Sequence, residues 1–133
     1  IRSFMAKIKV GIAGCLGRMG QELIKRILDD KNFLFVGGFE HKAHPKIGKK
    51  MSDVTDINSS SSITSNALSI FKKANVVIDF TTPQSTLSNV KIASTTKTAL
   101  VIGTTGISNA QKAKIKTLSK KIPILMSSNM SVG

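Results

Sequence analysis

Three closely spaced glycines near the start of the chain are the residues with the clearest chemical meaning. Gly14, Gly17 and Gly20 stand in the run KVGIAGCLGRMG, after an apolar stretch from Lys7 to Ala13. Apolar residues at helical spacing follow directly, namely Leu23, Ile24, Ile27 and Leu28. Because glycine has no Cβ, backbone N–H groups and a helix N-terminus can approach a phosphate closely. The order of strand, glycine turn and helix therefore predicts a Rossmann unit that binds the pyrophosphate of a dinucleotide.

An acidic residue at the end of the next apolar run fits the same ligand. Phe33 to Phe39 is apolar, and Glu40 follows it at a distance of 20 residues from Gly20. A carboxylate near this separation accepts hydrogen bonds from the adenosine ribose hydroxyls in such domains. We therefore expect the glycine turn and Glu40 to bind NADH or NADPH. The alternative is a turn whose glycines only permit tight packing.

Cys15 lies inside the glycine turn and has two interpretations. A helix N-terminus can lower the pKa of a thiol, which would make Cys15 reactive. We favour the simpler role of a small side chain beside the phosphates. Cys15 is the single cysteine and cannot form an internal disulfide, and the first residues contain no secretory signal. We therefore expect a reducing, cytoplasmic setting.

The formal net charge of +13 raises the question of nucleic acid binding, because clustered basic residues gain affinity from phosphates. The lysines are instead spread along the chain, and Tyr and Trp are absent. We therefore predict a solvated lysine-rich surface and no nucleic acid partner. No apolar stretch approaches the roughly 20 residues that span a bilayer, so we expect no membrane partner. We predict no metal site.

The rest of the chain alternates between strand and helix patterns. We predict a short helix around residues 67–71, strands at 74–80, 99–103 and 122–126, and helices from 82 to about 95 and from 108 to about 121. Thr82 before Pro83, and Ser108 three residues before Gln111, are helix start signals. The alternation predicts an α/β fold, a Rossmann-like doubly wound parallel sheet.

The stretch from His41 to Asp56 is polar, contains Pro45 and Gly48, and leads into Ser59 to Ser62. We predict a flexible or disordered surface segment there.

Length and chain ends predict one incomplete dinucleotide-binding domain over residues 1–133. The chain starts at Ile1, and Met5 is a plausible natural start, which would make residues 1–4 leftover or disordered sequence. The chain stops after a strand pattern with no closing helix or cap. We expect it to be part of a longer protein.

Four motifs resemble the N-terminal half of the dihydrodipicolinate reductase family. They are GCLGRMG at 14–20, DFTTP at 79–83, GTTG at 103–106 and SSNMSVG at 127–133. They occur in order and cover nearly the whole chain. That family, also called 4-hydroxy-tetrahydrodipicolinate reductase, uses NADH or NADPH to reduce a cyclic dicarboxylate in diaminopimelate and lysine biosynthesis. The resemblance therefore implies an NAD(P)H-dependent oxidoreductase.

The resemblance also implies which residues contact the cofactor. They are Gly14, Cys15, Leu16, Gly17, Arg18, Met19, Glu40, His41, Phe80, Gly103, Thr104, Thr105, Ser127, Ser128, Asn129 and Met130. Thr105 would contact the substrate as well. As alternatives, Phe80 would only pack at a strand end, the GTTG loop would be only a turn and Asn129 only a cap.

Two positions depart from the family pattern. His41 stands where relatives often have an arginine for the 2′-phosphate of NADPH, although Lys42 is adjacent. We therefore expect both cofactors to bind; the alternative is that His41 and Lys42 are merely solvated. Met130 replaces an aromatic residue of some relatives, so ring stacking would become a thioether contact.

In the family, a second domain supplies the histidine and lysine that bind the dicarboxylate and provide the proton. The resemblance therefore implies no catalytic residue in this chain, no activity of the chain alone, a partly uncovered sheet and a homotetrameric full-length protein. A dinucleotide-binding or redox-sensing module without chemistry is the first alternative, and a basic nucleic acid binder is the second.

Overall fold

The computed structural model describes residues 6–126, which form one five-stranded sheet. The strands are β1 (Ile8–Ala13), β2 (Phe33–Phe39), β3 (Val76–Asp79), β4 (Ala99–Ile102) and β5 (Ile124–Met126). They lie in the order β2-β1-β3-β4-β5, and every neighbouring pair is parallel. The chain starts at β1, adds β2 on one side and later returns to add β3 on the other. The predicted doubly wound α/β fold is confirmed.

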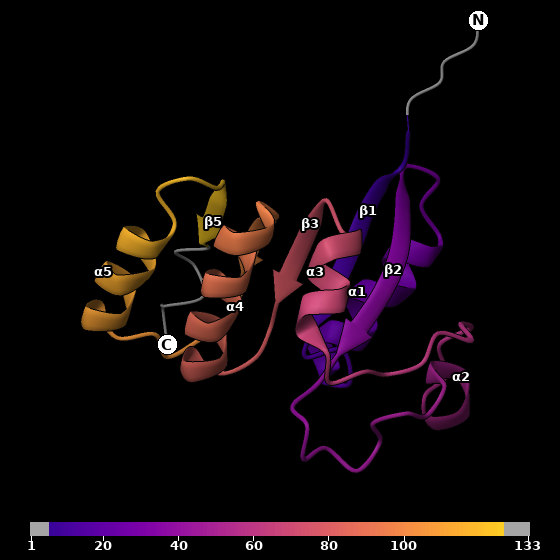
Figure 1. Cartoon of the computed structure of the whole chain (residues 1–133). Coiled ribbons are helices and arrows are strands. Elements are labelled where there is room, and N and C mark those ends of the chain that lie inside the picture. Colours follow the sequence, from indigo (N-terminus) through magenta and orange to yellow (C-terminus); the bar gives the residue numbers. More distant parts are fainter. Residues whose placement is uncertain (1–5, 127–133) are drawn as a thin grey trace, which may run out of the picture.

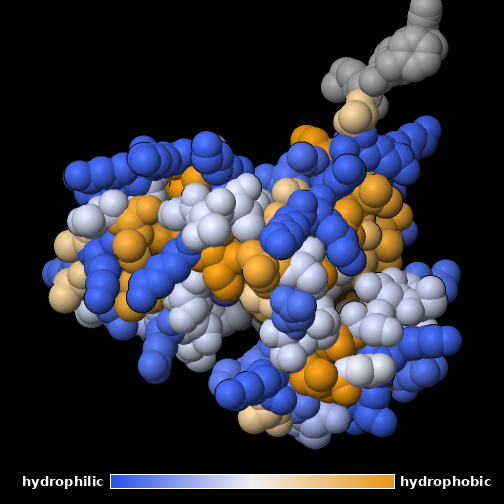
Figure 2. All heavy atoms as spheres, viewed as in Figure 1, coloured by the Kyte–Doolittle hydropathy of each residue, from blue (hydrophilic) through white to orange (hydrophobic). Residues whose placement is uncertain are grey.

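Helices cover both faces of the sheet. They are α1 (Arg18–Leu28), α2 (Met51–Val54), α3 (Ala67–Lys73), α4 (Pro83–Thr96) and α5 (Asn109–Leu118). Figure 1 shows α3, α4 and α5 on the near face of the sheet and α1 behind it. Among residues 6–126, no helix is both long and apolar enough to cross a membrane. Figure 2 shows hydrophilic side chains over much of the near face, with hydrophobic patches between them.

The predicted helix starts are confirmed in detail. The Thr82 hydroxyl accepts from the Ser85 N–H, and Ser108 and Gln111 exchange both hydrogen bonds of a capping box. Helix α5 ends at Leu118, three residues before the predicted end, and β3 and β5 are two to three residues shorter than predicted. These differences concern element ends, where irregular turns replace regular hydrogen bonding.

The segment after Glu40 was predicted to be flexible or disordered, and this prediction is wrong, because the segment packs against the core. Met51, Ile57 and Ile63 are each 1% exposed and pack with Val10, Ile12 and Ile24 of β1 and α1. Backbone hydrogen bonds from Gly48 to Ile63 and from Ile63 to Lys49 close the segment. The three apolar residues are six positions apart, which matches neither helix nor strand periodicity, so the polar composition hid this packing.

One row of side chains crosses the sheet on the face that carries α1. Ile12, Ile78, Val101 and Leu125 are neighbours in register. Ile12 is fully buried, Ile78 and Val101 are half-buried, and Leu125 is 65% exposed. Within residues 6–126, helical cover on this face therefore fades from β1 to β5. The expected partly uncovered sheet is confirmed.

Candidate dinucleotide-binding site

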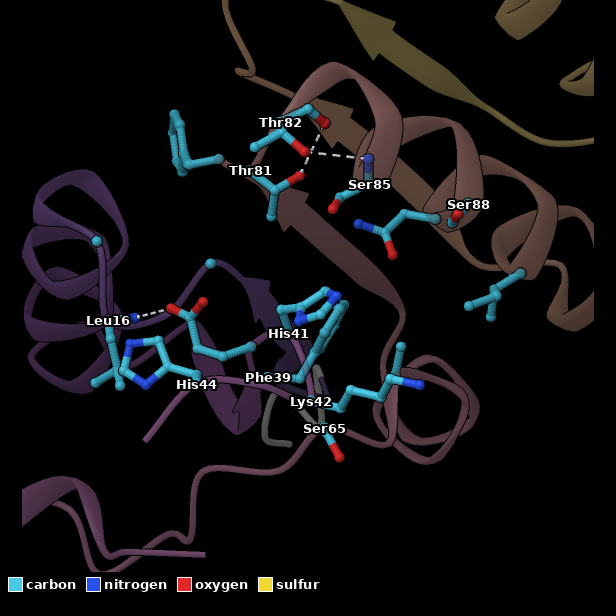
Figure 3. Close-up of a pocket in the computed structure, with 17 residues that line it drawn as sticks. Leu16, Phe39, His41, Lys42, His44, Ser65, Thr81, Thr82, Ser85 and Ser88 are labelled. Atoms are coloured by element: carbon cyan, nitrogen blue, oxygen red, sulfur yellow. Dashed lines mark hydrogen bonds between the residues drawn. The ribbon is translucent and has the colours of Figure 1, made fainter. Parts of the chain in front are cut away.

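A cavity of about 580 Å³ opens beside the carboxyl ends of β1, β2 and β3. Its walls come from the glycine turn, from the loop after β2 and from the first turns of α4. They include Gly14, Leu16, Gly17, Phe39, Glu40, His41, Lys42, His44, Phe80, Thr81, Thr82, Ser85, Ser88, Asn89 and Ile92. Figure 3 shows His41 and Lys42 on one side of this space and Ser85 and Ser88 on the other. Segments that follow three neighbouring strands therefore meet at one cavity.

The glycine turn leaves no room for side chains at two positions. Gly14 has a φ of 78°, and a Cβ there would lie 2.4 Å from the Phe80 carbonyl oxygen. A Cβ on Gly20 would lie 2.3 Å from the Gly14 carbonyl oxygen. The turn is thus pressed against the loop after β3 and against the first turn of α1, and glycine is the residue that allows both approaches.

The N-terminus of α1 offers free amides to this cavity region. Gly17 is the N-cap and has no side chain to bond the first turn. In the part of the chain from 6 to 126, the N–H groups of Arg18 and Met19 donate to no protein acceptor. Free N–H groups and the positive end of the helix dipole together favour an anionic ligand such as a pyrophosphate.

Glu40 joins the glycine turn to the end of β2. Its Oε2 accepts a hydrogen bond of 2.7 Å from the Leu16 N–H, drawn as a dashed line in Figure 3. Its Oε1 accepts no hydrogen bond from the residues between 6 and 126. The Leu16 amide is therefore used by Glu40, while the other carboxylate oxygen can still accept a hydrogen bond from a ligand. This link spans 24 residues, and no pattern in the sequence indicated it.

Cys15 is fully buried, and its side chain faces Gly38 rather than the cavity. Burial, with a further contribution from the nearby Glu40 charge, raises the pKa of the Cys15 thiol to about 12. The reactive-thiol interpretation is therefore wrong. The favoured interpretation, a small side chain beside the phosphates, is also not supported, because the Cys15 side chain does not line the cavity.

We expect Cys15 of the folded chain to resist alkylation by iodoacetamide at pH 8. The thiol stays protonated below its raised pKa, and burial also blocks the reagent. Mass spectrometry would show labelling only after guanidinium unfolds the chain, which serves as the positive control. Rapid labelling of the folded chain would contradict this account.

The two histidines after Glu40 orient their rings through backbone hydrogen bonds. Nδ1 of His41 accepts from the Ala43 N–H and Nδ1 of His44 from the Lys46 N–H, both at 3.1 Å. With Nδ1 accepting, Nε2 carries the proton in the neutral ring and can donate to a ligand. His41 is a predicted site residue, whereas His44, which was not predicted as one, also lines the cavity.

Gly103, Thr104 and Thr105, which the resemblance assigns to the cofactor, do not line this cavity. Phe80 lines it, and a Cβ on Gly103 would lie 2.3 Å from the Phe80 ring, so the loop after β4 packs on that ring. Thr104 is 6% exposed and its hydroxyl bonds within the protein, whereas Thr105 is exposed. Ser127, Ser128, Asn129 and Met130 lie outside the described residues, as do residues 1–4.

The first turns of α4 supply cavity residues that the sequence analysis did not include. Ser85, Ser88 and Asn89 line the cavity, and Figure 3 shows Ser85 and Ser88 on the side opposite His41. Their position follows from Thr82 and Pro83, which start α4 immediately after β3. Because that helix start lies at the carboxyl end of a central strand, this signal could have placed them at the site.

Comparison with known proteins agrees with this geometry. The family model described as dihydrodipicolinate reductase, N-terminus, matches residues 8–130. The chain belongs to the dihydrodipicolinate reductase family. The 4-hydroxy-tetrahydrodipicolinate reductase of Pelagibacter ubique is 47% identical over 130 residues, which are 97% of this chain and 46% of the relative. That of Polynucleobacter necessarius is 36% identical over 126 residues, 95% of this chain and 47% of the relative.

A solved member of the dihydrodipicolinate reductase family has the same fold. The dipicolinate-bound enzyme from Paenisporosarcina sp. TG-14 superposes with a TM-score of 0.72 and 26% identity, over 92% of this chain and 48% of that one. This chain therefore spans about half the length of the family members it matches, and it corresponds to their N-terminal half.

Proposed function

We propose that this chain binds NADH and NADPH as the cofactor half of a 4-hydroxy-tetrahydrodipicolinate reductase. The observation that carries the proposal is the cavity that Gly14, Gly17 and Glu40 line together, next to the helix start of α1, where the Arg18 and Met19 amides have no acceptor among residues 6–126. Membership of a family whose relatives are named as this reductase supports it. It also favours a reductase over a module that only senses the dinucleotide.

Each part of the cavity has a distinct task in this proposal. The amides of Arg18 and Met19 hold the pyrophosphate, and Gly14 and Gly17 let it approach the backbone. Oε1 of Glu40 accepts hydrogen bonds from the adenosine ribose hydroxyls. The bound nicotinamide supplies a hydride for reduction of the cyclic dicarboxylate. Thr105 contacts the substrate, while the proton and the remaining dicarboxylate contacts come from residues outside this chain, so the chain alone reduces nothing.

The side chains of Glu40, His41 and Lys42, which follow β2, accommodate both NADH and NADPH. The Glu40 carboxylate favours the free 2′-hydroxyl of NADH, because it repels a 2′-phosphate. His41 and Lys42 supply a ring N–H donor and an ammonium beside it, which favour the 2′-phosphate of NADPH. We propose dual use of NADH and NADPH on this basis. For the full-length protein we propose a cytoplasmic homotetramer, with neither nucleic acid nor membrane as a partner.

Titration of the purified chain with NADH tests the proposal directly. The sequence contains no Trp or Tyr, so the fluorescence of bound NADH can be followed without interference from protein emission. We expect saturable binding of one NADH per chain, displaced by NADPH and by ADP-ribose. Calorimetry that detects no binding of either nucleotide at millimolar concentration would refute it. The full-length protein, and not this chain, should oxidise NADH when given the dicarboxylate.

A further inference from the structure

A fully buried carboxylate beside the cavity is not accounted for by cofactor binding. Asp79 ends β3 and is 0% exposed. Its Oδ1 accepts from the hydroxyls of Thr81 at 2.6 Å and Thr104 at 3.1 Å, and its Oδ2 accepts from the Asn89 amide at 3.0 Å. Among residues 6–126 no Lys or Arg pairs with it. A buried carboxylate needs such donors, so this cluster is built around Asp79.

Thr104 is the residue through which the cluster reaches the loop after β4. Its hydroxyl donates to Asp79, and it accepts from the Thr81 N–H at 3.0 Å and from the Thr86 hydroxyl at 2.9 Å. Thr104 and Thr86 are 6% and 0% exposed. The hydroxyl therefore satisfies two donors and one acceptor at once, and its removal leaves all three short of a partner.

The cluster joins three segments that meet at the carboxyl ends of β3 and β4. Asp79 is the last residue of β3 and Thr81 follows it, Thr86 and Asn89 belong to α4, and Thr104 belongs to the loop after β4. The β3 segment is itself in contact with the glycine turn, since Gly14 lies against the Phe80 carbonyl. The cluster thus fixes the loop after β4 relative to the turn that receives the pyrophosphate.

The position of this loop indicates which half of the ligand it serves. Glu40 and the glycine turn place the adenosine and pyrophosphate over β2 and β1. In a doubly wound sheet the dinucleotide crosses the switch point, which here lies between β1 and β3. The nicotinamide half then extends toward the carboxyl end of β4, where Gly103 to Gly106 lie.

We propose that Asp79 and Thr104 are positioning residues that hold the loop after β4 in place for the nicotinamide half of the cofactor. They act through hydrogen bonds to Thr81, Thr86 and Asn89 and need not touch the ligand. This inference rests on the proposed dinucleotide function. It predicts that breaking the cluster weakens binding of the nicotinamide half selectively and leaves the adenosine half largely unaffected.

The test compares NADH with ADP-ribose, which lacks the nicotinamide, in calorimetric titrations of the whole chain. Thr104→Val removes the hydroxyl at nearly constant volume, and Thr104→Ser restores it. We expect Thr104→Val to weaken NADH binding about tenfold, because its partners lose their hydrogen bonds. ADP-ribose affinity should change by less than about twofold. Thr104→Ser should return NADH affinity to within about threefold of the original chain.

Thr98 provides the matched control at the opposite end of β4. It is 3% exposed, and its hydroxyl donates to the Phe71 carbonyl at 2.8 Å. Thr98→Val therefore removes a buried, hydrogen-bonded hydroxyl away from the cavity. We expect a loss of thermal stability and no change in either affinity.

Each alternative outcome has a defined meaning. The positioning role would be overturned if Thr104→Val lost affinity equally for NADH and ADP-ribose, or if Thr98→Val lost affinity for NADH alone. Either outcome would leave the proposed function intact. An original chain that binds NADH no more tightly than ADP-ribose would overturn the positioning role as well. If the original chain binds neither ligand, the proposed function fails, and this inference fails with it.

Discussion

Gly20→Ala is expected to destabilise the chain and to disable dinucleotide binding together. The added Cβ would lie 2.3 Å from the Gly14 carbonyl oxygen and 3.0 Å from Cys15 Cα, both backbone atoms that cannot rotate away. The first turn of α1 must therefore move from the glycine turn. We expect the free energy of unfolding to fall by about 3 kcal/mol, measured by denaturant titration with circular dichroism.

The same displacement should reduce NADH affinity roughly tenfold or more in any Gly20→Ala protein that remains folded, because the α1 amides no longer meet the pyrophosphate in register. Gly17→Ala is the matched control in the same turn. Its Cβ would have its nearest contact at an ordinary 3.4 Å, with no positive φ to oppose it. We expect its stability to change by no more than about 1 kcal/mol. Equal stability of the two variants would contradict the packing described for the turn.

Among the variants that leave the fold intact, Glu40→Ala is expected to cause the largest loss of NADH affinity. It removes the acceptor for the ribose hydroxyls and also the Leu16 anchor that ties the glycine turn to β2. Hydrogen bonds to a charged group contribute about 1.5–3 kcal/mol each, so we expect binding to weaken roughly 10- to 100-fold. Fluorescence titration with NADH would measure this loss, and an unchanged affinity would exclude Glu40 from the site.

A second substitution of Glu40 should change the preference between NADH and NADPH, measured by the same titration. Glu40→Gln keeps an oxygen for the Leu16 N–H but removes the negative charge beside the 2′ position. We expect the ratio of NADPH affinity to NADH affinity to rise about tenfold. Glu22→Gln makes the same chemical change on α1, where Glu22 lies 3.8 Å from Lys25 at the surface. A comparable shift in that control would show that only the net charge matters.

Signals that are local in the sequence led to correct elements. Thr82 with Pro83 and Ser108 with Gln111 each satisfy helix N–H groups within three residues, so the chain itself encodes those helix starts. The glycine turn lies between a strand and a helix as its pattern indicates. The parallel sheet followed from the alternation of such elements.

Features that depend on distant contacts were not visible in the sequence. The burial of Met51, Ile57 and Ile63 depends on α1 and β1, and their spacing gives no regular pattern. Two hydrogen bonds likewise join distant segments: Leu16 and Glu40 are 24 residues apart, and Asp79 and Thr104 are 25 residues apart. The site residues could therefore be named from motifs, whereas the way they support one another required the structure.

The uneven helical cover of the sheet has a consequence for local opening of the domain. Leu125 is largely exposed, and among residues 6–126 β5 is a three-residue edge strand that pairs only with β4, whereas Ile12 at the other end of the row is fully buried. Amide hydrogens in β5 should exchange with solvent well before those of β1, since local opening requires little apolar surface to be given up there. In the proposed binding mode, the adenosine end of the cavity lies over the strands expected to exchange slowly, and the nicotinamide half extends toward the part of the sheet expected to open more readily.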